Sequence, residues 1–367
     1  MLRVTPSTHP WRRTDRGLIR LMPPMVMMMA LAGAWPGQAT SAQACHAVSH
    51  QTCAIAHALG RGINLGNMLE APREGDWGVR LEPAFIALAT QHFQTVRLPV
   101  RWTNHATPSA DARIDEAFAR RVDGVVDALL ARGVRVILNV HHYTQLTGGT
   151  LHPGEFAVDP AVLEERLVNL WRQIAWRYRY KSPRLLFELL NEPHGDLEGE
   201  RWNQLAARTL AAVRPTNPTR TVLIGPADWN HPRALSRMRL PSDAFLIASI
   251  HSYDPFAFTH QGVTWRPRPL PTGVRCCNEA QRAQVVGALD DAVQWNRAQG
   301  VPVYLSEFGA YQAGDLQARA AYARLVRDEA ERRAIGWAWW EWGSDFSGVY
   351  LPAQRAWVEP LREALLD

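Results

Sequence analysis

The sequence predicts an α/β fold in which eight parallel strands and their connecting helices form a (β/α)8 TIM barrel of one domain. Short apolar runs rich in β-branched residues alternate with longer amphipathic stretches, a pattern typical of parallel strands joined by helices. The alternation repeats eight times in about 320 residues, which is enough chain for such a barrel. No composition break divides residues 60–367, so one domain is the simplest interpretation.

The strands are expected, in chain order, at Gly62–Gly66, Thr95–Val100, Val134–His141, Leu185–Leu190, Val222–Gly225, Leu246–His251, Pro302–Glu307 and Gly336–Trp340. Helical periodicity is clearest over Ile114–Arg132, Ala161–Tyr178, Asn203–Val213, Asn278–Ala298 and Leu316–Arg333, and Trp357–Asp367 is expected to be the last helix. A doubly wound open sheet is the alternative fold, but it would need a glycine-rich phosphate loop after its first strand. The segment that begins at Gly62 lacks the third glycine of that loop.

The first 44 residues have the layout of a secretory signal peptide. An arginine-rich start precedes the apolar stretch Leu21–Ala34, and the motif Ala42-Gln43-Ala44 provides an A-x-A cleavage signal. We therefore expect cleavage after Ala44, an N-terminal extension over residues 45–59 and the barrel over residues 60–367. An uncleaved apolar anchor is the alternative, although no uninterrupted run of 18 apolar residues marks a membrane span.

The charge of the chain is concentrated in this leader. The formal net charge is +5, and the leader alone carries five Arg and one Asp. Because about one positive charge is left on the rest of the chain, the basicity does not indicate a nucleic-acid partner. Lys181 is the single lysine beside 39 arginines, which indicates a GC-rich and hence bacterial genome. Together with the leader, this predicts a secreted bacterial protein, either extracellular or periplasmic.

Four cysteines follow the leader, and an oxidising compartment permits disulfides between them. Adjacent cysteines rarely pair with each other, so we expect Cys45 and Cys53 each to bridge to one member of the Cys276 and Cys277 pair. Such bridges would tie the N-terminal segment to a late loop. Free thiols are the alternative, whereas neither pair has the spacing of a zinc site.

Polar and aromatic side chains gather on or directly after six expected strands, toward the end where barrels hold their active sites. They are Arg97; His141, His142 and Tyr143; Asn191 and Glu192; His251 and Tyr253; Glu307; and Trp340 with Glu341. Each could singly be structural, but six such groups on one rim are hard to obtain by chance. Two carboxylates on opposite walls of one pocket suit glycoside hydrolysis, in which one donates a proton and the other attacks or activates water.

The order of these motifs resembles glycoside hydrolase family 5, the cellulase family. The resemblance extends from about Gly60 to Tyr350 and rests on Gly62-Ile-Asn-Leu-Gly-Asn-Met-Leu-Glu-Ala-Pro, Val96-Arg-Leu-Pro, His141-His-Tyr, Leu189-Leu-Asn-Glu-Pro, His251-Ser-Tyr, Ser306-Glu-Phe-Gly and Trp339-Trp-Glu-Trp. It implies a (β/α)8 barrel and a retaining double displacement. Glu192 would be the acid/base and Glu307 the nucleophile.

The resemblance also implies roles for the residues beside the two carboxylates. Arg97 and Tyr253 would hydrogen-bond the nucleophile, and Asn191 would bind the sugar 2-hydroxyl. Glu188 shares the side-chain parity of Glu192 on its strand, so it should point into the barrel below the site and hydrogen-bond there.

Three histidines and one early segment complete the residues carried over from the family. His142 and His251 would position the substrate and the acid/base, with His141 close by. The segment that contains Asn67 and Glu70 resembles family members whose cleft binds further glycosyl units.

Tryptophan is abundant and has two expected uses. Trp340 would line the subsite of the reacting sugar. Four others fall on loops expected after strands and could form platforms for a polymer, with packing against loops as the alternative: Trp77, Trp102, Trp229 and Trp265.

The activity that the resemblance implies is hydrolysis of internal β-1,4-glucosidic bonds in cellulose or a related β-glucan. The same mechanism on mannan, xyloglucan or β-1,3-glucan, transglycosylation, and non-catalytic sugar binding are the alternatives. A metal-dependent hydrolase is disfavoured, because the His pair sits on the third strand rather than the first. We expect no cofactor, no metal, no nucleic acid, no membrane contact after cleavage of the leader, and a monomer.

Overall fold

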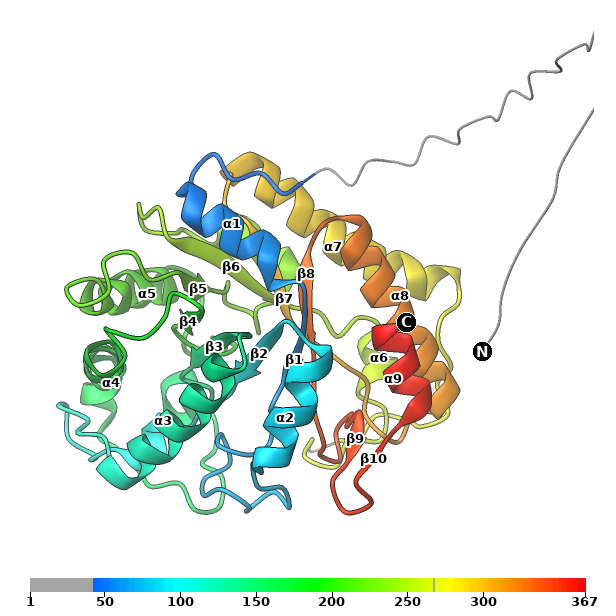
Figure 1. The fold of residues 1–367 in the computed structure, drawn as a ribbon, viewed down its shortest axis with the longest axis horizontal. Helices are drawn as coiled ribbons and strands as arrows, with labels where there is room; N and C mark the ends of the chain where they lie inside the picture. Colours follow the sequence, from blue (N-terminus) through cyan, green and yellow to red (C-terminus); the bar gives the residue numbers. More distant parts are fainter. Residues whose placement is uncertain (1–41, 267) are drawn as a thin grey trace, which may run out of the picture. The chain divides into compact units, whose positions relative to one another are not determined.

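The computed structural model describes residues 42–266 and 268–367, in which eight parallel strands close into a barrel (Figure 1). Each strand pairs with the next along the chain, and β1 pairs with β8 to complete the ring. The strands are β1 Arg61–Asn64, β2 Thr95–Leu98, β3 Arg135–Asn139, β4 Leu185–Glu188, β5 Val222–Ile224, β6 Leu246–His251, β7 Val303–Phe308 and β8 Gly336–Trp339. The predicted barrel is confirmed. The predicted signal peptide lies outside the described residues except for positions 42–44.

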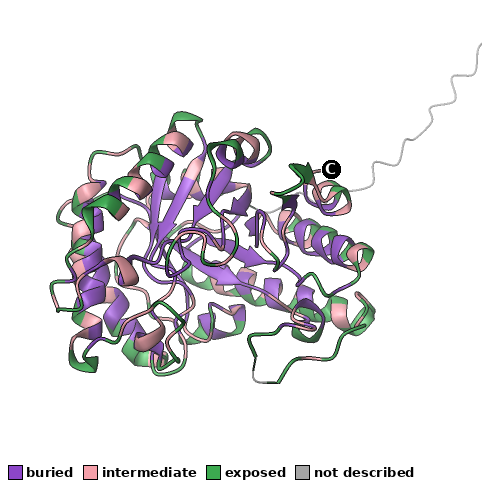
Figure 2. Cartoon of the chain, turned by 90° about the horizontal axis from the view of Figure 1, so that it is seen from below, coloured by how far each residue is buried: buried purple, intermediate pink, exposed green. Residues whose placement is uncertain are grey.

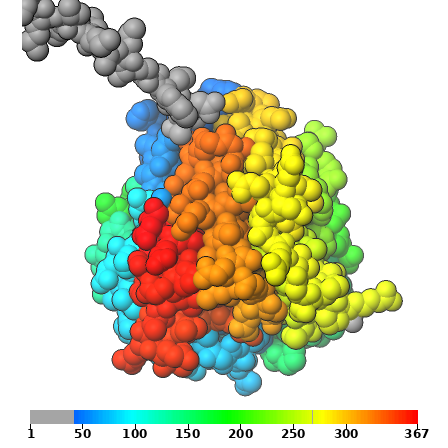
Figure 3. All heavy atoms as spheres, turned by 90° about the vertical axis from the view of Figure 1, so that its right-hand side faces the viewer, coloured from blue at the N-terminus to red at the C-terminus, as the bar shows by residue number. Residues whose placement is uncertain are grey.

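Helices surround the barrel, and the first of them closes its amino end. They are α1 His50–Leu59, α2 Pro83–His92, α3 Glu116–Ala131, α4 Leu163–Arg177, α5 Gly199–Val213, α6 Phe256–Thr259, α7 Glu279–Gln299, α8 Leu316–Arg332 and α9 Glu359–Leu366. Figure 3 shows α7, α8 and α9 side by side on one outer face. The short hairpin of β9 Tyr350–Leu351 and β10 Ala356–Trp357 precedes α9. Among the described residues, no helix has both the length and the apolarity to cross a bilayer.

Burial follows the expected layering of such a barrel. The strands are buried almost throughout, and each surrounding helix buries the side that faces them (Figure 2). Helix α4 shows the pattern well, because its buried apolar residues recur at helical spacing while its other side is charged. Helix α2 was not among the predicted helices, because its ten residues, Pro83–His92, are mostly apolar and show little periodicity.

An apolar floor fills the inside of the barrel near the amino ends of the strands. Side chains of alternate strand residues point inward, and the floor consists of Ile137, Leu186, Leu223, Ile247, Tyr304 and Ala338. Helix α1 lies across this end and adds Ala56 and Leu59 to the same cluster. The amino end is therefore closed, and the carboxyl ends of the strands are left for a functional site.

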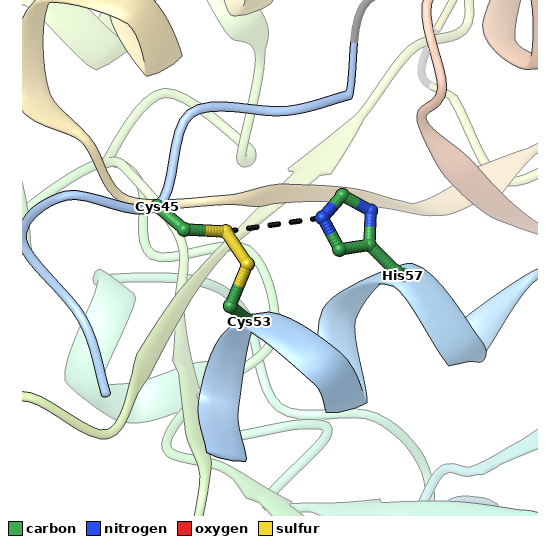
Figure 4. A group of neighbouring side chains, drawn as sticks. All are labelled: Cys45, Cys53 and His57. Atoms are coloured by element: carbon green, nitrogen blue, oxygen red, sulfur yellow. Dashed lines mark hydrogen bonds between the residues drawn. A yellow bond between two sulfur atoms is a disulfide. The ribbon is translucent and has the colours of Figure 1, made fainter. Parts of the chain in front are cut away.

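The disulfides differ from the prediction. Cys45 bonds to Cys53, with 5.7 Å between their Cα atoms (Figure 4). Cys276 bonds to its neighbour Cys277. The predicted cross-bridges are wrong because helix α7 separates the two pairs. Its 21 residues span about 30 Å, and Cys277 lies just before its first turn. Ala44, the residue before Cys45, hydrogen-bonds through its backbone to Asn296, which lies in the last turn of α7. The two cysteine pairs therefore lie near opposite ends of this helix.

The Cys45–Cys53 bond closes a loop of about nine residues, so chain-entropy arguments give it about 2.5 kcal/mol of stability. Replacing Cys53 with Ser is expected to lower the free energy of unfolding by about that amount, measured by urea denaturation followed by circular dichroism. The double variant Cys45→Ser/Cys53→Ser should lose no more than the single variant. An unchanged denaturation midpoint would contradict the assignment.

Candidate active site

A layer of polar side chains lies directly above the apolar floor. The strand period of two makes these residues point inward one layer nearer the carboxyl ends. All are fully buried: Asn64, Arg97, Asn139, Glu188, Ser249 and Ser306. Only Arg97 and Glu188 had been singled out from the sequence. The others could have been found by the same parity rule, because each stands two positions after a residue at floor level on its strand.

Arg97 connects this layer to the residues above it. Its Nε donates to Glu188 at 2.7 Å, and Nη1 donates to Asn64 at 3.0 Å and to Glu307 at 2.5 Å. Nη2 donates to Asn191 at 2.8 Å. Although burial opposes its charge, the carboxylates of Glu188 and Glu307 raise the pKa of Arg97 above its usual range. A permanently charged guanidinium therefore lies beneath the site.

Glu188 takes the place predicted for it below the site. Its carboxylate accepts hydrogen bonds from Arg97, from Asn139 at 3.0 Å and from Ser249 at 2.6 Å. Burial disfavours its ionisation, but Arg97 outweighs this and lowers the pKa of Glu188. With its oxygens fully used and no exposed surface, Glu188 positions Arg97 and does not face a ligand.

Glu192 and Glu307 face one another across the carboxyl end of the barrel. A carboxylate oxygen of each lies within 4.8 Å of the other and of His251. Nδ1 of His251 is 2.9 Å from Glu192 Oε1 and 3.5 Å from Glu307 Oε2. Burial lowers the pKa of His251 to about 4, so its ring is neutral near pH 7. We assign the ring proton to Nδ1, because Nε2 faces the amide nitrogen of Asn230 at 3.4 Å.

The two carboxyl groups have different surroundings. Glu307 is 5% exposed and accepts hydrogen bonds from charged Arg97 and from Tyr253, the latter at 2.8 Å. Glu192 is 25% exposed and accepts a hydrogen bond from neutral His251. Burial raises the pKa of Glu192 to about 7. Burial also raises the pKa of Glu307, but His251 and Arg97 act to lower it. This asymmetry suits one proton donor and one ionised group.

The local backbone at Glu192 directs its side chain. The residue has φ +47°, in the left-handed region that non-glycine residues seldom adopt. His194 supports the turn, because its Nδ1 lies 2.6 Å from the Glu192 carbonyl oxygen. The ring of His194 stacks on Trp229, with 4.5 Å between ring centroids. Such strain at the end of a buried strand is common at functional positions.

The remaining predicted residues of the rim are also brought together. The ring of His141 stacks on Trp340 at 5.3 Å between centroids, and its Nδ1 lies 3.1 Å from Asn139. His142 lies edge-on to His141, and burial lowers its pKa well below the usual value. Asn191 is held by Arg97. These side chains form one wall beside the carboxylate pair.

The sequence predicts that the segment of Asn67 and Glu70 binds further glycosyl units, but the Glu70 side chain is not available to a ligand. It is fully buried, and its carboxylate accepts the backbone N–H groups of Asn67 and Met68. Burial raises the pKa of Glu70 to about 8. Asn67 instead lies partly exposed and contacts Ser344 through its amide. Glu70 thus shapes the loop that presents Asn67.

Glu341, which the sequence left without a role, holds the loop after β8. Its buried carboxylate accepts hydrogen bonds from the backbone of Gly343 at 2.8 Å and from the backbone and hydroxyl of Ser344 at 2.9 Å. The same loop places Phe346 in a small apolar cluster with Trp340. Glu341 therefore supports the wall behind Trp340.

The four tryptophans predicted as candidate platforms differ in their exposure to solvent. Trp102 is fully buried and donates to the Asn139 carbonyl at 3.0 Å, so its prediction as a platform is wrong and packing explains it. Trp229 is 49% exposed and Trp265 is 58% exposed. Trp77 is partly exposed and lies edge-on to His142 at 5.6 Å. Three of the four can therefore meet a ligand.

Two groups of side chains bring metal-ligating atoms within 4.8 Å among the described residues. One is the carboxylate pair with His251. The other is Cys45, Cys53 and His57, where His57 Nε2 lies 4.0 Å from the Cys45 sulfur (Figure 4). Because these two sulfurs are bonded to each other, neither offers the thiolate that a metal requires.

A (β/α)8 barrel with a close carboxylate pair at the carboxyl ends of its strands defines a class of barrel glycoside hydrolases. Residues 60–346 match the family model described as cellulase (glycosyl hydrolase family 5). The chain belongs to this family, which is a retaining one. One oxygen of each carboxylate lies within 4.8 Å of an oxygen of the other, which is compatible with the separation of about 5–5.5 Å between the carboxyl groups of retaining enzymes.

Similar proteins include endoglucanase H and the cellulase/esterase CelE of Acetivibrio thermocellus. The first is 36% identical over 78% of this chain, and the second is 32% identical over 79%. The chain spans 30% and 36% of the length of these two relatives. Among solved structures, Cel5A of Thermotoga maritima in complex with mannotriose is 37% identical with a TM-score of 0.80. That match covers 85% of this chain and 99% of the other.

The hydrogen bond from Tyr253 to Glu307 is expected to keep the pKa of Glu307 lower than burial alone would set it. Replacing Tyr253 with Phe removes a donor to the ionised form, so the titration midpoint of Glu307 moves to higher pH. Carbon-13 NMR of labelled glutamate carboxyls would measure it, with the signal assigned by its loss in Glu307→Gln. The exposed Tyr180→Phe is the matched control. A downward shift would contradict the assignment.

Proposed function

We propose that this protein is a retaining endo-β-1,4-glucanase in which Glu307 is the nucleophile and Glu192 the acid/base. The observation that carries the proposal is the asymmetric carboxylate pair. One member is buried against a fixed positive charge, and the other is more exposed, has a pKa of about 7 and faces it within 4.8 Å. The substrate is a β-glucan chain.

In the first step, an oxygen of Glu307 attacks the anomeric carbon while Glu192 transfers its proton to the leaving glycosidic oxygen. Arg97 and Tyr253 hold the attacking carboxylate in place through one oxygen each. Asn191 is positioned by Arg97 to hydrogen-bond the 2-hydroxyl of the reacting sugar. The bond to the leaving sugar breaks as the glycosyl-enzyme ester forms.

In the second step, Glu192 is ionised and takes a proton from the incoming water. That water attacks the anomeric carbon, the ester bond breaks and Glu307 is released as a carboxylate. The neutral ring of His251 donates to Glu192 through Nδ1, which helps the carboxylate persist between the steps. Transglycosylation differs only in that a sugar hydroxyl takes the place of the water.

The β-glucan assignment follows the names of the relatives, which are endoglucanases, and the three aromatic platforms on the rim. Exposed tryptophans stack against the apolar faces of sugar rings, as a polymer chain requires. Mannan is the second candidate, because Cel5A of Thermotoga maritima has been solved both with mannotriose and with cellobiose. We further propose that the protein is secreted from a bacterium through its leader and acts as a monomer without a cofactor.

Substrate choice can be tested by reducing-sugar release from a polysaccharide panel. Carboxymethylcellulose and mixed-linkage β-glucan are expected to be cleaved, with little release from mannan, xyloglucan or laminarin. Glu307→Gln should reduce release by about 10⁵-fold, since the nucleophile is lost, whereas the exposed Glu363→Gln should not change it. Release mainly from mannan would leave the mechanism intact and overturn the substrate.

The acid/base role of Glu192 predicts a pH dependence. Because Glu192 must be protonated in the first step, kcat/KM for cello-oligosaccharides should fall as the pH rises through about 7. Glu192→Gln should lose about 10³-fold on these substrates and far less on an aryl glycoside with a good leaving group. The exposed Glu198→Gln is the control. If kcat/KM of Glu192→Gln still fell as the pH rises through about 7, the acid/base role of Glu192 would be contradicted.

A further inference from the structure

Gln43, which the sequence places inside the leader, is part of the folded barrel. It is 8% exposed, and its side-chain nitrogen donates to the carbonyl oxygens of Val303 and Ala334, both at 3.0 Å. Its side-chain oxygen accepts the N–H of Val303 at 2.6 Å. Val303 begins β7, and Ala334 precedes β8 with φ +56°. One amide side chain thus joins the starts of two neighbouring strands.

Ala44 is held just as firmly by an amide of α7. The Ala44 N–H donates to Asn296 Oδ1 at 2.9 Å, and Asn296 Nδ2 donates back to the Ala44 carbonyl at 2.8 Å. Asn296 is 4% exposed and also holds Val301. The chain continues into the Cys45–Cys53 disulfide, and the Ala47 N–H donates to Gly300. The anchor formed by Gln43 and Ala44 therefore continues directly into the bonds that fix α1.

Cleavage after Ala44 would remove this anchor. It would leave the N–H of Val303 and Oδ1 of Asn296 without their partners at buried positions, whereas Nδ2 of Asn296 would keep its bond to Val301. Unpaired buried polar groups are destabilising. Cleavage before Gln43 keeps every one of these bonds. Ala42 is exposed and Gln43 is buried, so the boundary of the folded domain falls between them.

We infer that the leader is cut at the bond between Ala42 and Gln43, and that Gln43 and Ala44 form an amide anchor of the mature barrel. Thr40 and Ala42 supply the small residues that a signal peptidase needs at the third and first positions before the cut. The reaction is a hydrolysis in which water adds across that one peptide bond. The inferred cleavage site rests on the proposed secretion. The stabilising role of Gln43 and Ala44 does not depend on secretion.

The processing site is tested by exporting the full chain from a bacterial host and determining the N-terminus of the exported protein by sequencing and intact mass. The expected first residue is Gln43. A first residue of Cys45, or export with the leader uncut, would overturn the inferred cut.

The anchor is tested separately on purified chains released by a protease that leaves no extra residues. The chain 45–367 is expected to unfold about 5 °C below the chain 43–367, since five hydrogen bonds are lost. Gln43→Ala in the longer chain should account for part of this loss, and the exposed Gln51→Ala for none. Equal unfolding midpoints would overturn the anchor.

Activity on a soluble cello-oligosaccharide separates this inference from the proposed function. Both chains should have the same kcat/KM at 25 °C, because the anchor lies at the amino end of the barrel and the carboxylates at the carboxyl end. A large loss of activity in a folded 45–367 chain would overturn a purely structural anchor. Inactivity of both chains would count against the proposed substrate and leave the stability comparison valid.

Discussion

The buried guanidinium of Arg97 is the interaction on which the rest of the site depends. A charge without exposed surface is costly unless its donors are matched by acceptors, and here they are met by Glu188, Asn64, Glu307 and Asn191. Removing Arg97 would leave these four groups without their shared donor, and removing one acceptor would leave a buried donor of Arg97 with fewer partners. The four acceptors thus depend on one guanidinium, and its hydrogen bond holds Glu307 in place.

The same guanidinium makes the two facing carboxyl groups differ in their tendency to ionise. Glu307 receives a hydrogen bond from a cation, and Glu192 receives one from a histidine whose own burial keeps it neutral. Two identical carboxyl groups at short distance would otherwise compete for one proton. Because Arg97 donates its hydrogen bond to Glu307 and not to Glu192, a proton donor with a pKa of about 7 can stand opposite an ionised group. Fold and electrostatics thus assign the roles together.

The fold and much of the site could be predicted because both follow from strand periodicity. Strand ends converge in a barrel, and parity placed Glu188 below Glu192 correctly. Features that depend on loops or on distances between elements were missed. The predicted cysteine pairing was wrong because the length of α7 keeps the two pairs apart. Trp102 turns inward, where a backbone carbonyl of β3 accepts its N–H. Glu70 illustrates the same limit, since its loop uses the carboxylate internally.

The two ends of the barrel serve different purposes, and this division explains where strain is tolerated. At the carboxyl end, Glu192 adopts a left-handed backbone and charges are buried, features that cost stability. At the amino end, the apolar floor, helix α1, the Cys45–Cys53 bond and the amide of Gln43 hold neighbouring strands together. The stability gained at the amino end offsets the cost of the site without any contact with it. Substitutions there should change unfolding and leave the chemistry unchanged.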